Sequence, residues 1–382
     1  MTYDLLIRNA RVIDPLRNAD GVEDVFIRNS KIVPAPPNDD FQVKEMVDAT
    51  GYLVTPGLID FHTHLAYRFS DIGLNPDVFF LPNGITAAVD AGTTGSSSFE
   101  SLVHNVMATS ALTIKSYLNI SPVGLTTVKY LENYDPAVFD IPKMAYLFER
   151  YPEYILGLKV RVGKDFSAAR RFEPLHSAAK LGERFQCPIY VHIIGSEDSL
   201  DEAMPYFKAG DVFAHFLHGV GPHTIFDESG NIRPSVLAAR ERGVYFDNSA
   251  GSRGRSLAVA AKAIGMGFYP DIISADVTPF NVYKKGTFSM LRIMSECLCM
   301  GMPLMEVVRA CTQAPAKLMG MENTIGTLAP GALADVTILK ILEKPVHLND
   351  ALGNTYDIDR LFVPQMTVKA GRIMYRQMEF TF

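Results

Sequence analysis

The sequence lacks several features that would place the protein in a special class. It has only four cysteines among 382 residues, and it contains no run of 18 apolar residues that could cross a membrane as a helix. The first residues, MTYDLLIRNARVID, carry charges where a secretory signal peptide has an apolar segment. We found no low-complexity segment and no internal repeat. We therefore expect a soluble, cytoplasmic globular protein.

The few cysteines are scattered, and only Cys297 and Cys299 lie close together, in SECLCMG. A spacing of two residues is weak evidence for a metal site. We predict that Cys187, Cys297, Cys299 and Cys311 are reduced core residues.

A surplus of positive charge is also absent. The chain has 36 Lys and Arg against 42 Asp and Glu, a net charge of -6, and 48% of its residues are hydrophobic. This balance gives no indication of a nucleic-acid or membrane partner, and it provides material for a large core. We expect a small-molecule substrate as the partner, and association of several copies of the chain is left open.

Both ends of the sequence have the pattern of β-structure. YDLLIRNARVID and DVFIRNSKIV near the start, and LADVTILKI and RLFVPQMTVKAGRIMYR near the end, alternate apolar and polar residues between turn signals. This period of two predicts antiparallel sheet.

The middle of the chain alternates short apolar runs with helical patterns. Eight such runs over about 220 residues are the number expected of a (β/α)₈ TIM barrel. We therefore predict an α/β protein with a barrel over residues 55–326 and a small β-sandwich domain built from residues 1–54 plus 327–382. The runs are GLIDFHTH (57–64), GITAAVDAG (84–92), LTIKSYLNI (112–120), YILGLKVRV (154–162), PIYVHII (188–194), DVFAHFLH (211–218), GVYFDNS (243–249) and DIISADV (271–277).

Residues able to bind metal stand late in five of these runs. Barrel enzymes build their active sites at the carboxyl ends of the strands, so we expect these side chains to converge there. The two histidines of HTH are two positions apart and point the same way in a strand, which gives half of a metal site. Each residue alone has a structural explanation, such as a core histidine or a turn aspartate; the joint pattern favours metal. The residues are His62, His64, Lys159, His192, His215 and Asp276.

Lys159 is unusual because it lies inside an apolar strand. Its stem could pack on apolar neighbours while the ammonium reaches water. Alternatively, burial lowers the pKa of the amine, and the neutral amine takes up carbon dioxide to become a carbamate that binds two cations.

GLIDFHTH after VTPG, together with the later lysine, histidines and aspartate, resembles the amidohydrolase superfamily. The resemblance covers nearly the whole chain, since YDLLIRNARVID and GTLAPGALADVTIL are similar to the segments of the small domain of that family. It implies a binuclear metal centre. His62, His64 and Asp276 would hold one ion, His192 and His215 the other, and carboxylated Lys159 would bridge both.

The resemblance also implies the reaction. Two divalent ions, for which zinc is our first choice, would share a bridging hydroxide that attacks a substrate carbonyl. Asp276 would act as the catalytic acid–base group that passes the proton to the leaving group. If the sixth strand were longer, His218 could replace His215 as a ligand; the pattern AHFLHG favours His215.

The branch of the family is indicated by further residues. Dihydroorotases carry an arginine two places after the second histidine of HxH, where this chain has Ala66, and deaminases generally lack the lysine of strand four. VDAGTTGSSSFESL, LNISPVGLT and LKVRVG are similar to a dihydroorotase-like or deacetylase branch. We therefore predict hydrolysis of an amide or ester bond of a small acylated carboxylate. Relatives often have a histidine–glycine pair where this chain has Ser249 and Ala250, so their specificity need not apply.

Arg161 is the strongest candidate for binding the substrate, because it is two residues after Lys159 and should face the same way. Its alternative is a rim arginine paired with a loop carboxylate. The other candidates are Asn119, Ser252, Arg253 and Tyr67.

Two other function classes remain open. A cyclic amide hydrolase of the hydantoinase or dihydroorotase type would need a tyrosine donor after the third strand, where this chain offers Asn119. A non-catalytic scaffold protein of the same fold would have lost ligands, whereas all six candidates are present here.

Overall fold

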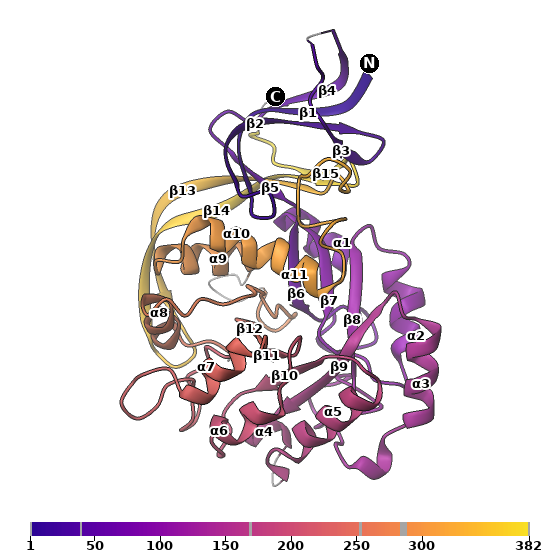
Figure 1. Cartoon of the computed structure of the whole chain (residues 1–382), viewed down its shortest axis with the longest axis vertical. Coiled ribbons are helices and arrows are strands. Elements are labelled where there is room, and N and C mark those ends of the chain that lie inside the picture. The colour runs from indigo at the N-terminus through magenta and orange to yellow at the C-terminus, as the bar shows by residue number, and fades with distance from the viewer. Residues whose placement is uncertain (1, 39, 168–169, 252–253, 283–288, 381–382) are drawn as a thin grey trace.

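The computed structural model of the chain describes residues 2–38, 40–167, 170–251, 254–282 and 289–380. It contains two β-sheets, which occupy different ends of the molecule (Figure 1). One is a curled parallel sheet with helices around it, and the other is built from the two ends of the chain. The protein is therefore of the α/β class predicted from the sequence, with a barrel-type sheet and a separate terminal sheet.

The parallel sheet has seven strands in the order β12-β11-β10-β9-β8-β7-β6. Each strand coincides with one of the predicted apolar runs, because a parallel sheet covered on both faces needs residues that are buried on both faces. The strands are β6 (Leu58–Thr63), β7 (Ile85–Asp90), β8 (Thr113–Asn119), β9 (Ile155–Val162), β10 (Ile189–Ile193), β11 (Val212–Ala214) and β12 (Tyr245–Asp247).

The eighth predicted run, residues 271–277, closes the gap between the first and last strands without forming a regular strand. It makes one parallel bridge, from Ile272 to Asp247 of β12. On its other side the amide of Asp276 donates to the carbonyl of His62 at the end of β6. The ring of strands is thus completed by an irregular segment that carries a predicted ligand.

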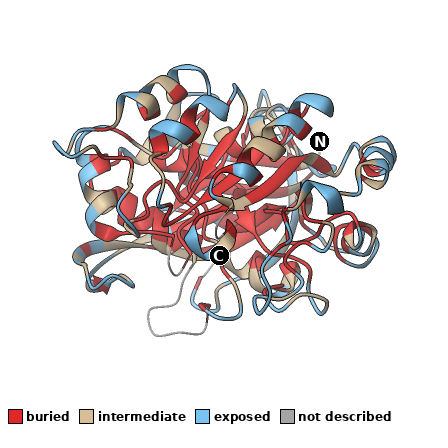
Figure 2. Ribbon diagram, turned by 90° about the horizontal axis from the view of Figure 1, so that it is seen from below, coloured by how far each residue is buried: buried red, intermediate tan, exposed pale blue. Residues whose placement is uncertain are grey.

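Helices cover the outside of the parallel sheet, and Figure 2 shows the buried strands at the centre with exposed residues around the periphery. The longer segments between strands are amphipathic, so their helices turn an apolar side inward. The α-helices are α1 (Pro76–Phe79), α2 (Phe99–Leu102), α3 (Ile141–Arg150), α4 (Lys164–Ser167), α5 (Glu173–Arg184), α6 (Leu200–Ala203), α7 (Pro234–Glu241), α8 (Leu257–Gly265), α9 (Met290–Cys299), α10 (Leu304–Cys311) and α11 (Gln313–Leu318).

The terminal sheet has eight strands and is mixed rather than purely antiparallel. Strand β1 pairs antiparallel with β2 but parallel with β4 and β5, and β5 lies between β1 and β13. The strands are β1 (Thr2–Asp14), β2 (Ala19–Arg28), β3 (Lys31–Val33), β4 (Gln42–Asp48), β5 (Leu53–Pro56), β13 (Val336–Asn349), β14 (Thr355–Lys369) and β15 (Arg372–Arg376).

The hairpin β13–β14 is long enough to leave the terminal sheet and run along the helices of the barrel (Figure 1). Its tip reaches the start of α8. There the carboxylate of Asp350 accepts from the amide of Leu257 at 2.8 Å, and the amide of Asn354 donates to Ser256 Oγ at 3.2 Å. The hairpin therefore joins the two parts of the molecule.

All four cysteines are free thiols; three are buried and Cys299 is half-buried. Among the residues that the structure describes, no helix has both the length and the apolar character needed to span a membrane.

Candidate metal centre

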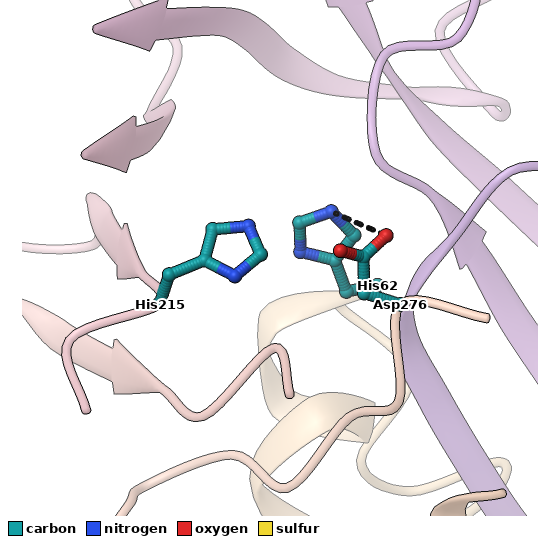
Figure 3. Close-up of side chains that lie close together, drawn as sticks. All are labelled: His62, His215 and Asp276. Carbon is teal, nitrogen blue, oxygen red and sulfur yellow. Dashed lines mark ion pairs between the residues drawn. The ribbon is translucent and has the colours of Figure 1, made fainter. Parts of the chain in front are cut away.

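Residues from three separate strand ends meet at the carboxyl side of the parallel sheet. A nitrogen of His62, a nitrogen of His215 and a carboxylate oxygen of Asp276 all lie within 4.8 Å of one another (Figure 3). His62 belongs to β6, His215 follows β11, and Asp276 lies near the end of the irregular eighth segment. His215 and Asp276 have positive φ angles of 62° and 49°. Such strained backbone is often found where side chains are positioned for function.

His64 joins the same cluster, and its ring orientation is fixed from behind. Its Nε2 lies 3.2 Å from Asp276 Oδ1, while its Nδ1 is 2.8 Å from Thr93 Oγ1. The Thr93 hydroxyl donates to the carboxylate of Asp90 at 2.7 Å. A histidine held through one ring nitrogen presents the other one to a ligand, which is the usual arrangement at metal sites.

His62 is held in a similar way by a different set of partners. Its Nδ1 lies 2.8 Å from the Tyr190 hydroxyl and 2.9 Å from Ser249 Oγ. Tyr190 in turn donates to the carboxylate of Asp247. The Nε2 of His62 faces Asp276 Oδ1 at 3.7 Å. Both histidines of HTH therefore point Nε2 towards the same carboxylate.

His192 and His215 form the other half of the cluster. Their ring centroids are 4.1 Å apart, and both side chains are buried. Within the described part of the chain, Nε2 of His192 and both ring nitrogens of His215 are buried without a hydrogen-bond partner. Buried polar atoms are nearly always paired in folded proteins, so these nitrogens need a partner of another kind.

Lys159 lies on β9 in register with Tyr190 of β10, and it is fully buried. Its Nζ is 4.2 Å from the centroid of the Tyr190 ring and has no hydrogen-bond partner among the described residues. The alternative in which the stem of Lys159 is packed and its ammonium reaches water does not agree with this burial. Burial lowers the pKa of Lys159 from 10.5 to about 7, so a large share of the amine is neutral at physiological pH.

Burial has the same effect on the histidines. It lowers the pKa of His215 to about 3, and it holds the pKa values of His62 and His192 well below 6.5, with the nearby cationic groups adding to the effect. The imidazoles are consequently neutral, which is the form that binds metal. The donor set of neutral imidazoles, a carboxylate and an uncharged amine fits divalent cations.

The residues predicted to bind the substrate lie in different places in the structure. Asn119 is buried and uses its amide within the protein, donating to the carbonyl of Gly92 and accepting from the amide of Ser121. Tyr67 is exposed and lines a different surface hollow, together with Arg68 and Asn105. Ser252 and Arg253 lie outside the described residues.

Arg161 does point to the side of the sheet that carries the cluster, since it pairs in register with His192 of β10. Its guanidinium, however, forms two hydrogen bonds of 2.6 Å with the carboxylate of Glu132. This geometry agrees with the alternative stated for Arg161, an arginine paired with a loop carboxylate.

The sequence reasoning missed the residues that orient the ligands. Tyr190 could have been found, because it is two positions before His192 on β10 and therefore shares its face. Asp90 ends β7 at the same edge as the other site residues. Glu132 lies in a loop with no periodic pattern, so nothing in the sequence connects it to Arg161.

The family model described as "Amidohydrolase family" matches residues 190–374. A protein named deacetylase from Agrobacterium fabrum is 27% identical over 327 residues, which cover 85% of this chain and 79% of the relative. A protein named deacetylase from Enterococcus faecalis is 26% identical, covering 98% of this chain and 99% of that protein.

Two solved structures are also similar to this chain over nearly its whole length. A crystal structure of an adenine deaminase has a TM-score of 0.88 and 26% identity, covering 98% of this chain and 100% of that one. A crystal structure of a dihydroorotase has a TM-score of 0.85 and 25% identity, covering 97% and 98%. With the barrel-type sheet and the buried histidine cluster, these likenesses establish that the chain is an enzyme of the amidohydrolase superfamily, a class of hydrolases.

Proposed function

We propose that this enzyme is a deacetylase-like metallohydrolase, which cleaves the amide or ester bond of a small acylated substrate. The observation that carries the proposal is a group of buried nitrogens of Lys159, His192 and His215. They have no hydrogen-bond partner among the described residues and lie beside the His62–Asp276 cluster. The similarity to proteins named deacetylase supports the acyl-transfer class. Whether the substrate also carries a carboxylate depends on Arg161, which is paired with Glu132.

The proposed ligands divide into two groups. His62, His64 and Asp276 would hold the more buried divalent ion, and His192 and His215 the more exposed one. Bound there, the ions supply Lewis acidity and lower the pKa of water to near neutrality. Zinc suits imidazole and carboxylate ligands, and manganese or iron would suit them as well.

Lys159 would bridge the two groups after reaction with carbon dioxide. Its neutral amine would attack the carbon, so that a bond forms between Nζ and that carbon. One C–O π bond of carbon dioxide breaks as its electron pair moves onto oxygen, and the nitrogen releases one proton to solvent. The product would be a carbamate, whose negative charge and two oxygens are suited to holding divalent cations. The burial that lowers the pKa of the amine makes this reaction accessible.

Asp276 would move the proton during hydrolysis. Its Oδ1 already lies 3.2 Å from His64 Nε2 and 3.7 Å from His62 Nε2, at the centre of the cluster. A carboxylate in that place can take a proton from the attacking water and deliver it to the leaving nitrogen or oxygen. His62 and His64 are kept in orientation by their Nδ1 partners and take no part in the proton transfer.

A cyclic amide hydrolase is the second candidate, because the dihydroorotase structure matches nearly the whole chain. Ala66 stands where dihydroorotases carry an arginine, and the Asn119 amide is engaged within the protein. These two residues favour the open-chain acyl substrate.

The test is a substrate panel with purified enzyme and measured metal content. We expect about two divalent ions per chain, as in other two-metal hydrolases, and turnover of N-acetyl amino acid derivatives or O-acetyl esters. Turnover of hydantoins or dihydroorotate alone would establish the cyclic amide alternative. Activity on adenine alone, with one ion per chain, would contradict both the reaction and the bridging role of Lys159.

A further inference from the structure

A second buried ionic group lies beside the metal centre and is not used by the mechanism above. Arg161 Nε and Nη2 each donate to one oxygen of Glu132 at 2.6 Å, so the contact is bidentate. The Tyr134 hydroxyl also donates to Glu132 at 2.9 Å, and it accepts from the backbone amide of Arg161 at 3.0 Å. The Glu132 side chain is 1% exposed and that of Arg161 is 16% exposed.

This group is separated from a candidate metal ligand by one aromatic ring. The Arg161 guanidinium lies 4.2 Å from the centroid of the Phe166 ring, and that ring meets His192 edge-on at 4.7 Å. Arg161 is also two residues after Lys159 on the same face of β9. The pair therefore forms part of the protein wall next to His192.

Glu132 is buried although the two hydrophobic residues before it are exposed. In the loop between β8 and α3, Tyr130 and Leu131 are 77% and 57% exposed, whereas Glu132 is 8% exposed. A loop that followed hydrophobicity alone would bury the leucine and expose the acid. The ion pair thus determines how this segment sits against the barrel.

The pair changes what the wall can bind. Arg161 would otherwise present a permanent cation with the geometry of a carboxylate receptor. The bidentate contact with Glu132 places a carboxylate directly on the donor edge of this guanidinium, where a substrate carboxylate would otherwise bind. An incoming carboxylate would have to break a buried bidentate pair and leave Glu132 without its partner, which is costly.

We propose that Glu132 is a specificity-determining residue that neutralises Arg161, so that the wall beside His192 accepts an uncharged substituent of the substrate and disfavours a carboxylate. Glu132 also borders a hollow of about 440 Å³ that is lined by apolar residues such as Val123 and by uncharged polar residues such as Thr126; none of the candidate metal ligands lines this hollow. The inference rests on the proposed function and defines its substrate class: a neutral acyl amide or ester instead of an acylated carboxylate.

The test compares two substrates that differ only in charge, an N-acetyl amino acid and its primary amide. For each enzyme variant, the quantity read is the ratio of kcat/KM for the acid to kcat/KM for the amide. We expect the wild type to prefer the amide. Glu132→Gln keeps the shape but releases the charge of Arg161, so the ratio should rise by at least about tenfold, mainly through KM for the acid.

A double variant, Glu132→Leu with Arg161→Met, is the matched control. It removes both charges together and replaces the pair by apolar groups, a change that buried ion pairs often tolerate. Its ratio should stay close to that of the wild type. If Glu132→Gln does not fold, the double variant still tests the proposal. A strong rise in its acid-to-amide ratio of kcat/KM, in the absence of the Arg161 guanidinium, would overturn the proposal.

Two results would overturn the proposal. One is an unchanged acid-to-amide ratio of kcat/KM in a folded Glu132→Gln variant. The other is a wild type that prefers the acid and loses this preference in Arg161→Met.

Binding of hexanoate and hexanamide, measured by calorimetry on the metal-loaded proteins, gives a readout that is independent of turnover. If the wild type hydrolyses neither these two substrates nor the O-acetyl esters of the panel, the proposed function fails. Tighter binding of hexanoate alone by Glu132→Gln would still support the role of Glu132, and equal binding by both proteins would refute it.

Discussion

Thr93 shows how a single hydroxyl can control a metal ligand. It joins His64 Nδ1 to the carboxylate of Asp90, and all three side chains are buried. Thr93→Val keeps the volume but leaves the Nδ1 of His64 without a partner. We expect metal affinity to fall by about 10- to 100-fold, the usual effect of losing such a partner. Competition with a chromogenic chelator measures the change.

The adjacent Thr94 offers a control for that experiment. Its side chain is also buried, but its Oγ1 has no hydrogen-bond partner within the described residues. Thr94→Val should therefore leave metal affinity unaltered. Equal losses in both variants would mean that local packing, and not the orientation of His64, controls binding.

Lys159 and Asp276 can be separated by their effects on metal content and on rate. Lys159→Ala removes the proposed bridge, so bound metal and activity should disappear together while the far-ultraviolet circular dichroism spectrum stays native. Asp276→Asn keeps a neutral oxygen ligand but removes the base. Its kcat should fall by about 10²–10⁴, more than its metal content falls. A Lys159→Ala enzyme with two ions and normal turnover would contradict the bridging role.

The convergence of the site was predictable from sequence because strand ends are predictable. Runs such as GLIDFHTH and PIYVHII mark where each strand stops, and the barrel brings those ends together. The partner of Arg161 was not predictable, since Glu132 is 29 residues away in an irregular loop. Ionic partners across loops follow from the tertiary structure alone.

At the scale of elements, the loop after β7 is shaped by close contact with β9. Gly92 has a φ of +79°, and a Cβ there would lie 2.3 Å from the Cβ of Lys159. Gly92→Ala should therefore destabilise the protein by more than about 1 kcal/mol, the least expected when alanine is forced into a positive φ. It should also displace Lys159 and lower the metal content. Urea unfolding and elemental analysis provide the two measurements.

Gly265, at the end of α8, is the matched control. A Cβ there meets no atom within 4 Å, and the residue is helical. Gly265→Ala should leave the metal content unchanged and stabilise the protein by about 0.5–1 kcal/mol, the advantage of alanine over glycine in a helix. A similar loss in both variants would show that the contact with Lys159 is unimportant.

The elements also show where periodicity ceases to predict structure. Seven of the eight apolar runs form the expected strands, but residues 271–277 make only one bridge. The amide of Ala275 donates to the side chain of Asp60 on β6 instead of to a backbone carbonyl, and Asp276 adopts a positive φ. A side-chain partner on the adjacent strand β6 thus overrides the local preference of DIISADV for a regular strand.

For the whole molecule, the metal centre should contribute to global stability. Its candidate ligands come from β6, β9, β10, β11 and the eighth segment, so ions bound there connect most of the barrel. Removal of metal with a chelator should lower Tm, since a ligand present at 100 times its Kd stabilises by about 2.7 kcal/mol. Scanning calorimetry with and without added metal tests this; identical curves would argue against a bound metal.

The position of β5 has a consequence for how the protein is made. Strand β5 pairs with β1 on one side and with β13 on the other. During translation β1 and β5 leave the ribosome early, whereas β13 follows only after the entire barrel has been synthesised. Until then the nascent chain exposes an open strand edge, which is a template for pairing with other chains. Slowing elongation, or raising the concentration of refolding protein, should therefore increase the aggregated fraction, with the vulnerable interval ending when β13 emerges.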